Sequence, residues 1–119
     1  MGVEKQTVLV LEDEVLISMD VEEALIEAGF HVAALRSCVD AAAFLADHRP
    51  DAAVLDVRLT DGDCSAIARH LVDQGVPFVV HTGMISEGQD PVFLLGARVT
   101  KPAGATAIVD RVKALLTVA

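Results

Sequence analysis

Short apolar runs that end on carboxylates are the feature that most constrains the fold of this chain. The clearest is Ala52–Leu55, which is followed directly by Asp56. Its length and its small or branched side chains predict a strand buried on both faces, as in a parallel sheet. An ionised Asp at the end of such a strand is costly unless it lies in an exposed crevice, is paired, or binds a cation. Asp56 is therefore the first candidate for chemistry.

The alternation of strand and helix extends along the whole chain. Thr7–Leu11 predicts another buried strand, which ends on Glu12, Asp13 and Glu14, and apolar residues at helical spacing follow it up to Gly29. Further strands are predicted at 30–35, 78–81 and 97–100, and helices at 39–47, at 64–74 and around 108–116. Ser37 is a possible cap for the helix that begins near 39. The order predicted is βαβαβαβ, followed by a last strand and a closing helix.

The segment from 84 to 95 is where this pattern weakens. Gly88, Pro91 and Gly96 fall where the next helix is expected. Both residue types destabilise a helix interior. The fourth helix is therefore predicted to be short, irregular, displaced or missing.

Strands that alternate with helices predict a mostly parallel, doubly wound α/β sheet with right-handed crossovers. In such sheets ligands bind beyond the carboxyl ends of the strands, where the strand order reverses. If the strands lie in the order 2-1-3-4-5 across the sheet, Glu12, Asp13 and Asp56 converge on one crevice. The fourth strand then brings Thr82 to the rim, and the fifth brings Lys101.

The residues gathered at this crevice indicate a site for a metal and a phosphoryl group. Three neighbouring carboxylates raise one another's pKa unless a cation is present, and Mg²⁺ prefers oxygen ligands of this type. Lys101, the Thr82 hydroxyl and the Gly83 amide could bind an anion. This set suits phosphoryl transfer with Asp56 as the nucleophile. A simpler interpretation of residues 12–14, a cap and favourable charges at a helix start, stays open.

Size and charge narrow the class of protein. The 119 residues, of which 53% are hydrophobic, predict one domain over 1–119 with a core of its own. A net charge of -9 argues against nucleic acid as a partner and favours a basic protein or a cation. No secretory leader or membrane span is predicted, and Cys38 and Cys64 lack ligand spacing. We therefore expect a cytoplasmic protein with reduced thiols.

The motifs together resemble those of the receiver domains of two-component response regulators, over essentially the whole chain. The resemblance rests on residues that follow four strands in order: Glu12-Asp13, Asp56, Thr82 and Lys101-Pro102. It implies a flavodoxin-like, five-stranded parallel sheet in the order 2-1-3-4-5.

The resemblance also implies a role for each residue at the crevice. Asp56 would accept a phosphoryl group from a phosphohistidine on a sensor histidine kinase or histidine phosphotransfer protein. Mg²⁺ would be bound by Asp13, Asp56 and the Arg58 backbone carbonyl, with Glu12 acting directly or through water. The phosphoryl group would be bound by Thr82, Gly83, Lys101 and Arg58. The resemblance further implies that Thr82 moves towards the phosphoryl group and that the Lys101–Pro102 bond is cis.

Two departures from the family pattern concern the output of the signal. Arg98 stands three residues before Lys101, where the family usually has an aromatic residue that moves inward with the threonine. Burying a guanidinium is far more costly than burying an aromatic ring, so the usual aromatic switch is predicted to be absent. The interrupted fourth helix, and Ala103 after the Lys-Pro pair, indicate in the same way that the signal leaves by another surface.

We therefore expect a stand-alone receiver that signals to separate partner proteins or drains phosphate from a kinase, and that catalyses only its own phosphorylation and dephosphorylation. The alternative is a docking module on the same fold whose contacts do not depend on phosphate. A flavin carrier of similar architecture is disfavoured, because four Phe and no Trp or Tyr leave few aromatics to cover a flavin ring. The four histidines are expected to be structural, with His81 the least certain because it precedes Thr82.

Overall fold

Five parallel strands form the centre of the molecule, which the computed structural model describes for residues 5–83, 89–101 and 104–117. The strands are β1 Thr7–Leu11, β2 His31–Leu35, β3 Ala52–Leu55, β4 Arg58–Leu59, β5 Gly62–Asp63, β6 Phe78–Thr82 and β7 Ala97–Thr100. The helices are α1 Val15–Glu27, α2 Cys38–Asp47, α3 Ser65–Asp73, the 3₁₀ helix η1 Pro91–Leu95, and α4 Ala105–Leu116. Among the described residues, no helix is both long enough and apolar enough to cross a membrane.

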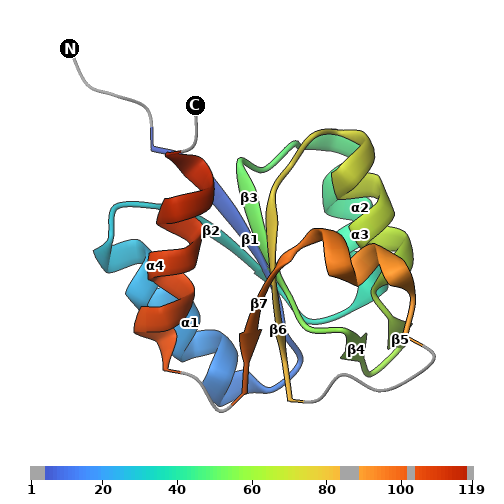
Figure 1. Cartoon of the computed structure of the whole chain (residues 1–119), viewed down its shortest axis with the longest axis horizontal. Coiled ribbons are helices and arrows are strands. Elements are labelled where there is room, and N and C mark those ends of the chain that lie inside the picture. The colour runs from blue at the N-terminus through green and yellow to red at the C-terminus, as the bar shows by residue number, and fades with distance from the viewer. Residues whose placement is uncertain (1–4, 84–88, 102–103, 118–119) are drawn as a thin grey trace.

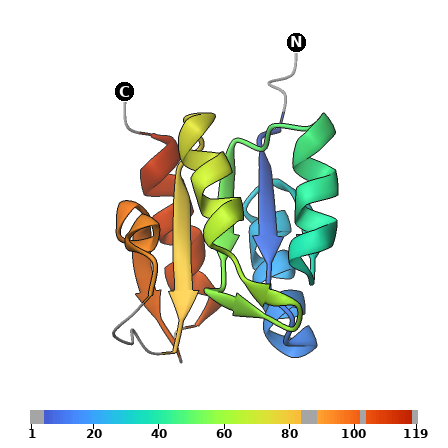
Figure 2. The ribbon, with the colours of Figure 1, turned by 90° about the vertical axis from the view of Figure 1, so that its right-hand side faces the viewer.

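The main sheet has the order β2-β1-β3-β6-β7, and each neighbouring pair is parallel. Counting only these five strands, this is the predicted order 2-1-3-4-5. Helices α1 and α4 cover one face of the sheet, and α2, α3 and η1 cover the other (Figures 1 and 2). The sheet is therefore the middle of three layers, and the predicted doubly wound fold is confirmed.

The central strands are apolar along their whole length because they contribute to two cores. In β3, Ala53 and Leu55 pack on the side of α2 and α3, whereas Ala52 and Val54 pack on the side of α1 and α4. Successive side chains of a strand point to opposite faces. All four residues are buried, so a polar side chain can enter this strand only at its end, which is where Asp56 lies.

The predicted boundaries of α2 and α3 hold to within about one residue, whereas α4 begins at Ala105, ahead of its predicted start near 108. Gly29 follows α1 with a φ of 100°, a left-handed conformation that glycine adopts readily. The Ser37 hydroxyl caps α2 by accepting a hydrogen bond from the Asp40 amide at 3.1 Å. In α3, Ile67 and Leu71 are buried, whereas Val72 is 39% exposed.

The connection between β6 and β7 contains η1 instead of a full α-helix, as predicted. Pro91 occupies the first turn of η1, and the Asp90 carboxylate accepts a hydrogen bond from the Val92 amide at 2.9 Å. Gly96 follows the last residue of η1. Residues 84–88, on which part of this prediction falls, lie outside the described residues.

A short hairpin of β4 and β5 follows Asp56. Arg58 pairs with Asp63 and Leu59 with Gly62 in an antiparallel ladder. Each strand has two residues, too few for the alternation that identifies a strand in a sequence. The Asp61 carboxylate at the tip accepts hydrogen bonds from the Cys38 and Val39 amides, at 2.9 and 3.1 Å. The hairpin thereby caps the start of α2.

Candidate functional site

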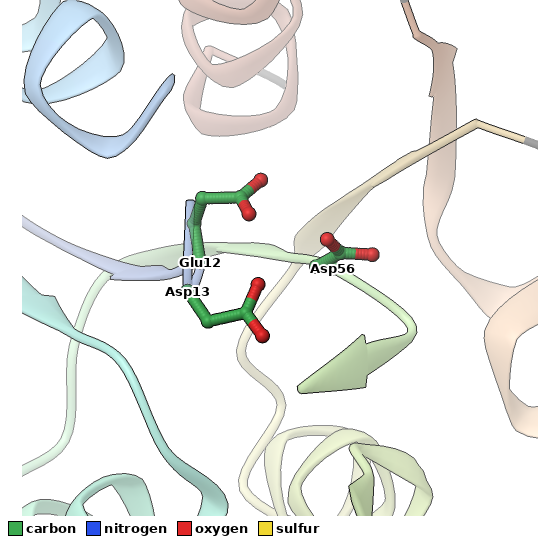
Figure 3. A group of neighbouring side chains, drawn as sticks. All are labelled: Glu12, Asp13 and Asp56. Atoms are coloured by element: carbon green, nitrogen blue, oxygen red, sulfur yellow. The ribbon is translucent and has the colours of Figure 1, made fainter. Parts of the chain in front are cut away.

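The three predicted carboxylates meet at the carboxyl end of the sheet. Leu11 of β1 and Leu55 of β3 are paired in register, so the residues that follow them emerge side by side. The Asp56 amide donates to the Leu11 carbonyl at 3.0 Å. Carboxylate oxygens of Glu12, Asp13 and Asp56 all lie within 4.8 Å of one another (Figure 3). The predicted convergence of acids distant in sequence is therefore present in the fold.

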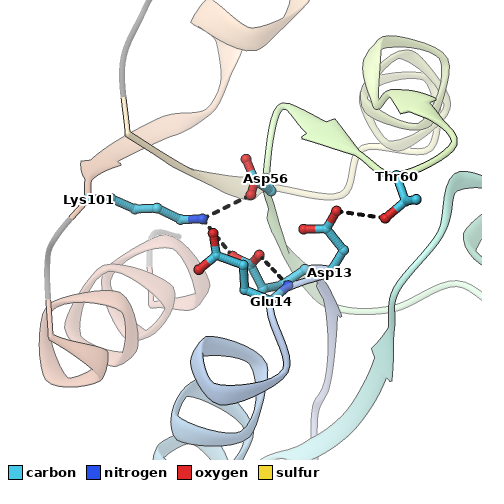
Figure 4. A network of polar contacts seen from close by, with 6 residues as sticks. Asp13, Glu14, Asp56, Thr60 and Lys101 are labelled. Atoms are coloured by element: carbon cyan, nitrogen blue, oxygen red, sulfur yellow. Dashed lines mark hydrogen bonds and ion pairs between the residues drawn. The ribbon is translucent and has the colours of Figure 1, made fainter.

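Lys101 lies against this acidic cluster, as predicted. Its Nζ atom is 2.9 Å from Oε1 of Glu12 and 2.9 Å from Oδ2 of Asp56 (Figure 4). The Lys101 amide donates to the Thr82 carbonyl at 2.8 Å, which fixes the end of β7 beside the end of β6. The Lys101 side chain is only 17% exposed, so both ion pairs are partly shielded from water.

Two further contacts orient the cluster, and the sequence did not indicate either of them. The Glu14 amide donates to Oε2 of Glu12 at 3.0 Å, and the Thr60 hydroxyl donates to Oδ2 of Asp13 at 3.0 Å (Figure 4). Thr60 lies in the hairpin between β4 and β5, whose two-residue strands have no recognisable pattern in the sequence. Glu14 occupies the N-cap position of α1 but its side chain makes no capping hydrogen bond, so only the part of the alternative interpretation that concerns favourable charges at the helix start stays open.

Burial and charge shift the pKa of two groups in the site. Burial raises the pKa of the Glu12 carboxyl, and the charge of Asp56 raises it further, although hydrogen bonds from the Glu14 amide and Lys101 oppose the shift. For Lys101, burial lowers the pKa, but hydrogen bonds to Asp56 and Glu12 together with their charges outweigh it and raise the pKa overall. The site therefore strongly favours a cation.

The donor set fits a hard divalent metal ion. All three candidate ligands offer carboxylate oxygens, the ligand type that Mg²⁺ prefers over nitrogen or sulfur. When the three acids are ionised, the single ammonium of Lys101 leaves two negative charges uncompensated. A cation of charge two would balance them. Glu12 is 4% exposed, while Asp13 and Asp56 are half-buried, so the cluster is accessible from one side.

The remaining predicted site residues lie on β4 and at the end of β6. Thr82 is buried at the end of β6, Gly83 is exposed directly after it, and Arg58 is exposed on β4. Thr82 and Arg98 both line a pocket of about 140 Å³ under η1. Pro102 and Ala103 lie outside the described residues, and with them the predicted cis bond after Lys101.

His81, which precedes Thr82 on β6, faces the layer formed by α1 and α4. It is 3% exposed and lines a pocket of about 180 Å³ between α1 and α4, together with Lys101. Its Nε2 atom has no hydrogen-bond partner among the described residues. Burial and the charge of Lys101 lower its pKa, so the imidazole is neutral at pH 7. Nothing in this arrangement contradicts the structural role expected for it.

Comparison of the sequence with known proteins places it near the response regulators. No family model matches the chain. The virulence transcriptional regulatory protein PhoP of Salmonella typhimurium is 32% identical over 114 residues, which cover 92% of this chain and 51% of that protein. The chain thus spans about half the length of the curated relatives it matches.

Solved structures of receiver domains have the same fold as this chain. The receiver domain of a signal transduction histidine kinase from Syntrophus aciditrophicus has a TM-score of 0.81 and 26% identity, over 94% of this chain and 90% of that one. The receiver domain of the sensor histidine kinase PA1611 from Pseudomonas aeruginosa PAO1 has a TM-score of 0.82 and 20% identity, over 97% and 100%. That structure has a magnesium ion coordinated in its active-site cleft.

Proposed function

The chain is a receiver domain of the two-component response-regulator family, and from this premise we propose that Asp56 accepts a phosphoryl group from a phosphohistidine. The donor would be a sensor histidine kinase or a histidine phosphotransfer protein. The observation that carries the proposal is the position of Asp56, whose carboxylate shares a crevice with two other acids and lies 2.9 Å from the Lys101 ammonium.

The reaction transfers one phosphoryl group between two side chains. A carboxylate oxygen of Asp56 attacks phosphorus, the phosphorus–nitrogen bond of the donor histidine breaks, and the leaving imidazole nitrogen keeps the electron pair. The nucleophile needs no proton removed, because Asp56 reacts as the carboxylate. Lys101, already beside Oδ2 of Asp56, would contact the transferred group and balance its charge.

The other residues of the crevice would hold the metal and the phosphoryl oxygens. We assign Mg²⁺ to Asp13, Asp56 and the Arg58 backbone carbonyl, with Glu12 binding directly or through water. When bound, the ion neutralises charge on the phosphoryl oxygens. Thr82, Gly83 and Arg58 would bind those oxygens from the β6 and hairpin sides. The oxygen-only donor set and its uncompensated negative charge support this assignment.

In the cell, we propose that residues 1–119 act as one cytoplasmic receiver domain that either signals to a separate protein or drains phosphate from its kinase. The domain would catalyse only its own phosphorylation and dephosphorylation. Its net charge of -9 favours encounter with partners that carry basic surfaces.

A mass measurement tests the proposal directly. The protein is incubated with Mg²⁺ and acetyl phosphate, and its intact mass is recorded. We expect the wild type to gain one phosphoryl group, and we expect neither Asp56→Asn nor the wild type treated with a chelator to gain it. The control Asp110→Asn, which changes an exposed acid on α4, should be labelled like the wild type. Labelling of Asp56→Asn would contradict the assignment of the acceptor.

A second candidate function is a docking module whose contacts do not depend on phosphate. Arg98 favours it, because an exposed guanidinium stands on β7 where the family usually has its mobile aromatic residue. If the wild type neither gains mass nor changes its spectra with beryllofluoride and Mg²⁺, the docking function is preferred. Labelling of the wild type at Asp56 would instead count against a docking function that does not depend on phosphate.

A further inference from the structure

The two cysteines, 26 positions apart in sequence, lie side by side in the fold. The Sγ atoms of Cys38 and Cys64 are 3.9 Å apart, and both thiols are free. Cys38 is the first residue of α2 and is half-buried, whereas Cys64 precedes α3 and is fully buried. A disulfide needs an S–S distance of about 2.05 Å, so each sulfur has to move by roughly 1 Å to form one.

The dithiol lies behind the hairpin that follows Asp56. The Cys38 thiol is 3.4 Å from the Asp63 carbonyl and 3.7 Å from the Gly62 carbonyl, both on β5. The Cys64 amide donates to the Val57 carbonyl at 2.8 Å. A bond between the two sulfurs would close a loop, from 38 to 64, that contains Asp56 and the whole hairpin.

We propose that Cys38 and Cys64 are a modification site, at which a peroxide converts the two thiols into an intramolecular disulfide. Cys38 reacts first because it is the thiol within reach of solvent. Its sulfur attacks one peroxide oxygen, so that an S–O bond forms and the O–O bond breaks. The leaving hydroxide takes up the thiol proton and becomes water.

Cys64 then resolves the sulfenic acid on Cys38. Its sulfur attacks the Cys38 sulfur, the S–S bond forms, the S–O bond breaks, and the departing hydroxide with the Cys64 proton gives a second water. In total, two thiols lose two electrons and two protons, and one hydrogen peroxide becomes two waters. The full burial of Cys64 does not impede this step, because its partner is the neighbouring sulfur and not a reagent from solvent.

The surroundings of the thiols make the reaction slow at neutral pH. Burial raises the pKa of Cys38, and the nearby Asp61 and Asp63 raise it further; burial also raises the pKa of Cys64. Since the thiolate is the reactive form, oxidation should accelerate as the pH increases. The site would therefore respond to sustained oxidant and not to brief exposure.

Peptide mapping of the peroxide-treated protein tests the proposal and needs neither Mg²⁺ nor a phosphoryl donor. The full-length chain is treated with hydrogen peroxide at pH 7 and pH 9, denatured without reductant, alkylated and digested with trypsin. We expect the number of alkylatable thiols to fall from two to none, with the loss of two hydrogens from the intact mass. A cross-linked peptide should join Cys38 to Cys64, and a reductant should restore both thiols.

Two single variants separate this pairing from unspecific oxidation. Cys38→Ser should keep its one thiol, because Cys64 is buried. Cys64→Ala should accumulate sulfenic acid on Cys38, which dimedone traps. The proposal is overturned if the wild type keeps both thiols at pH 9, gains oxygen on Cys38 without a cross-link, or forms only disulfides between two chains. Since the readout is the cross-link itself, the absence of a cross-link would not bear on the proposed phosphorylation of Asp56.

Discussion

The negative charge of the buried Glu12 carboxylate is unfavourable for folding, and a single substitution can remove it. The pKa of this buried carboxyl in the folded chain lies above its ordinary value of 4.5, chiefly because of burial. Ionised Glu12 therefore costs free energy of folding at neutral pH. We expect Glu12→Gln to be more stable than the wild type at pH 7 without metal. The advantage should fade as the pH falls from the raised pKa of the folded chain towards 4.5, and it should be absent below 4.5, where the wild-type carboxyl is protonated in both the folded and the unfolded chain.

Urea unfolding at several pH values measures this difference. Glu23→Gln, which neutralises an exposed acid on α1, is the matched control and should change stability little at any pH. A Glu12→Gln protein that is less stable than the wild type at pH 7 would mean that the ion pair with Lys101 outweighs the burial of the carboxylate.

Lys101 has the reverse role, because it compensates charges that would otherwise be unpaired. Its removal in Lys101→Met leaves Glu12 and Asp56 facing each other without a cation. We expect a loss of about 1–3 kcal/mol in the free energy of unfolding, below the range for fully buried pairs because the groups are partly exposed. Added Mg²⁺ should recover part of the loss, as measured by thermal unfolding.

Lys113→Met, which removes an exposed cation near the end of α4, is the control for this prediction. It should stay within about 0.5 kcal/mol of the wild type and should gain no more from Mg²⁺ than the wild type does. Equal effects of the two lysine substitutions would show that Lys101 contributes only to net charge.

Among the secondary-structure elements, the close contact between η1 and β6 depends on Gly96. A Cβ atom at this position would lie 2.5 Å from a ring carbon of Phe78 and 3.0 Å from its backbone carbonyl oxygen. The first distance is shorter than real Cβ contacts and the second is tighter than nine in ten of them, and the ring of Phe78 is buried. We expect Gly96→Ala to lower the free energy of unfolding by about 1–3 kcal/mol, as overpacking of a core does.

Gly104→Ala is the matched control, since nothing lies within 4 Å of the Cβ it would add. Its effect in the same unfolding experiment should be within about 0.5 kcal/mol. If Gly96→Ala proves as mild as the control, the contact between Gly96 and Phe78 is looser than the structure indicates.

The elements of the sheet could be predicted because burial imposes a simple pattern on them. Strands such as β3, apolar on both faces, and helices with glycine or serine at their ends show their periodicity and boundaries directly in the sequence. The β4–β5 hairpin and the exposure of Val72 could not be predicted. Both features depend on which residues pack against them in the fold. A few exposed residues show no hydrophobic periodicity in the sequence.

At the scale of the whole molecule, metal binding should appear as added stability. An ion that binds the folded chain alone raises the free energy of unfolding by about 2.7 kcal/mol at a concentration one hundred times its Kd. We expect Mg²⁺ to raise the Tm of the wild type and a chelator to reverse the shift. In Asp13→Asn the shift should be much smaller, whereas Asp110→Asn should keep it. A Tm that does not respond to Mg²⁺ in the wild type would argue against the metal site.

The candidate site could be predicted only as far as the sheet determines it. Glu12, Asp13, Asp56 and Lys101 follow strand ends, so the strand order alone brings them together. Thr60, which donates to Asp13, comes from the hairpin, and the pairing of Cys38 with Cys64 comes from the packing of α2 against α3. Such contacts between loops or helix ends have no signature in a single sequence.

The position of β7 at the edge of the sheet, next to β6 alone, has a consequence for protein synthesis. The ribosome delivers Glu12, Asp13 and Asp56 well before it delivers Lys101. A nascent chain that has not yet added β7 holds its acids together without their ammonium partner. The site is therefore complete only once residue 101 has been translated, and release of the chain before that point would leave three neighbouring acids without the ammonium group.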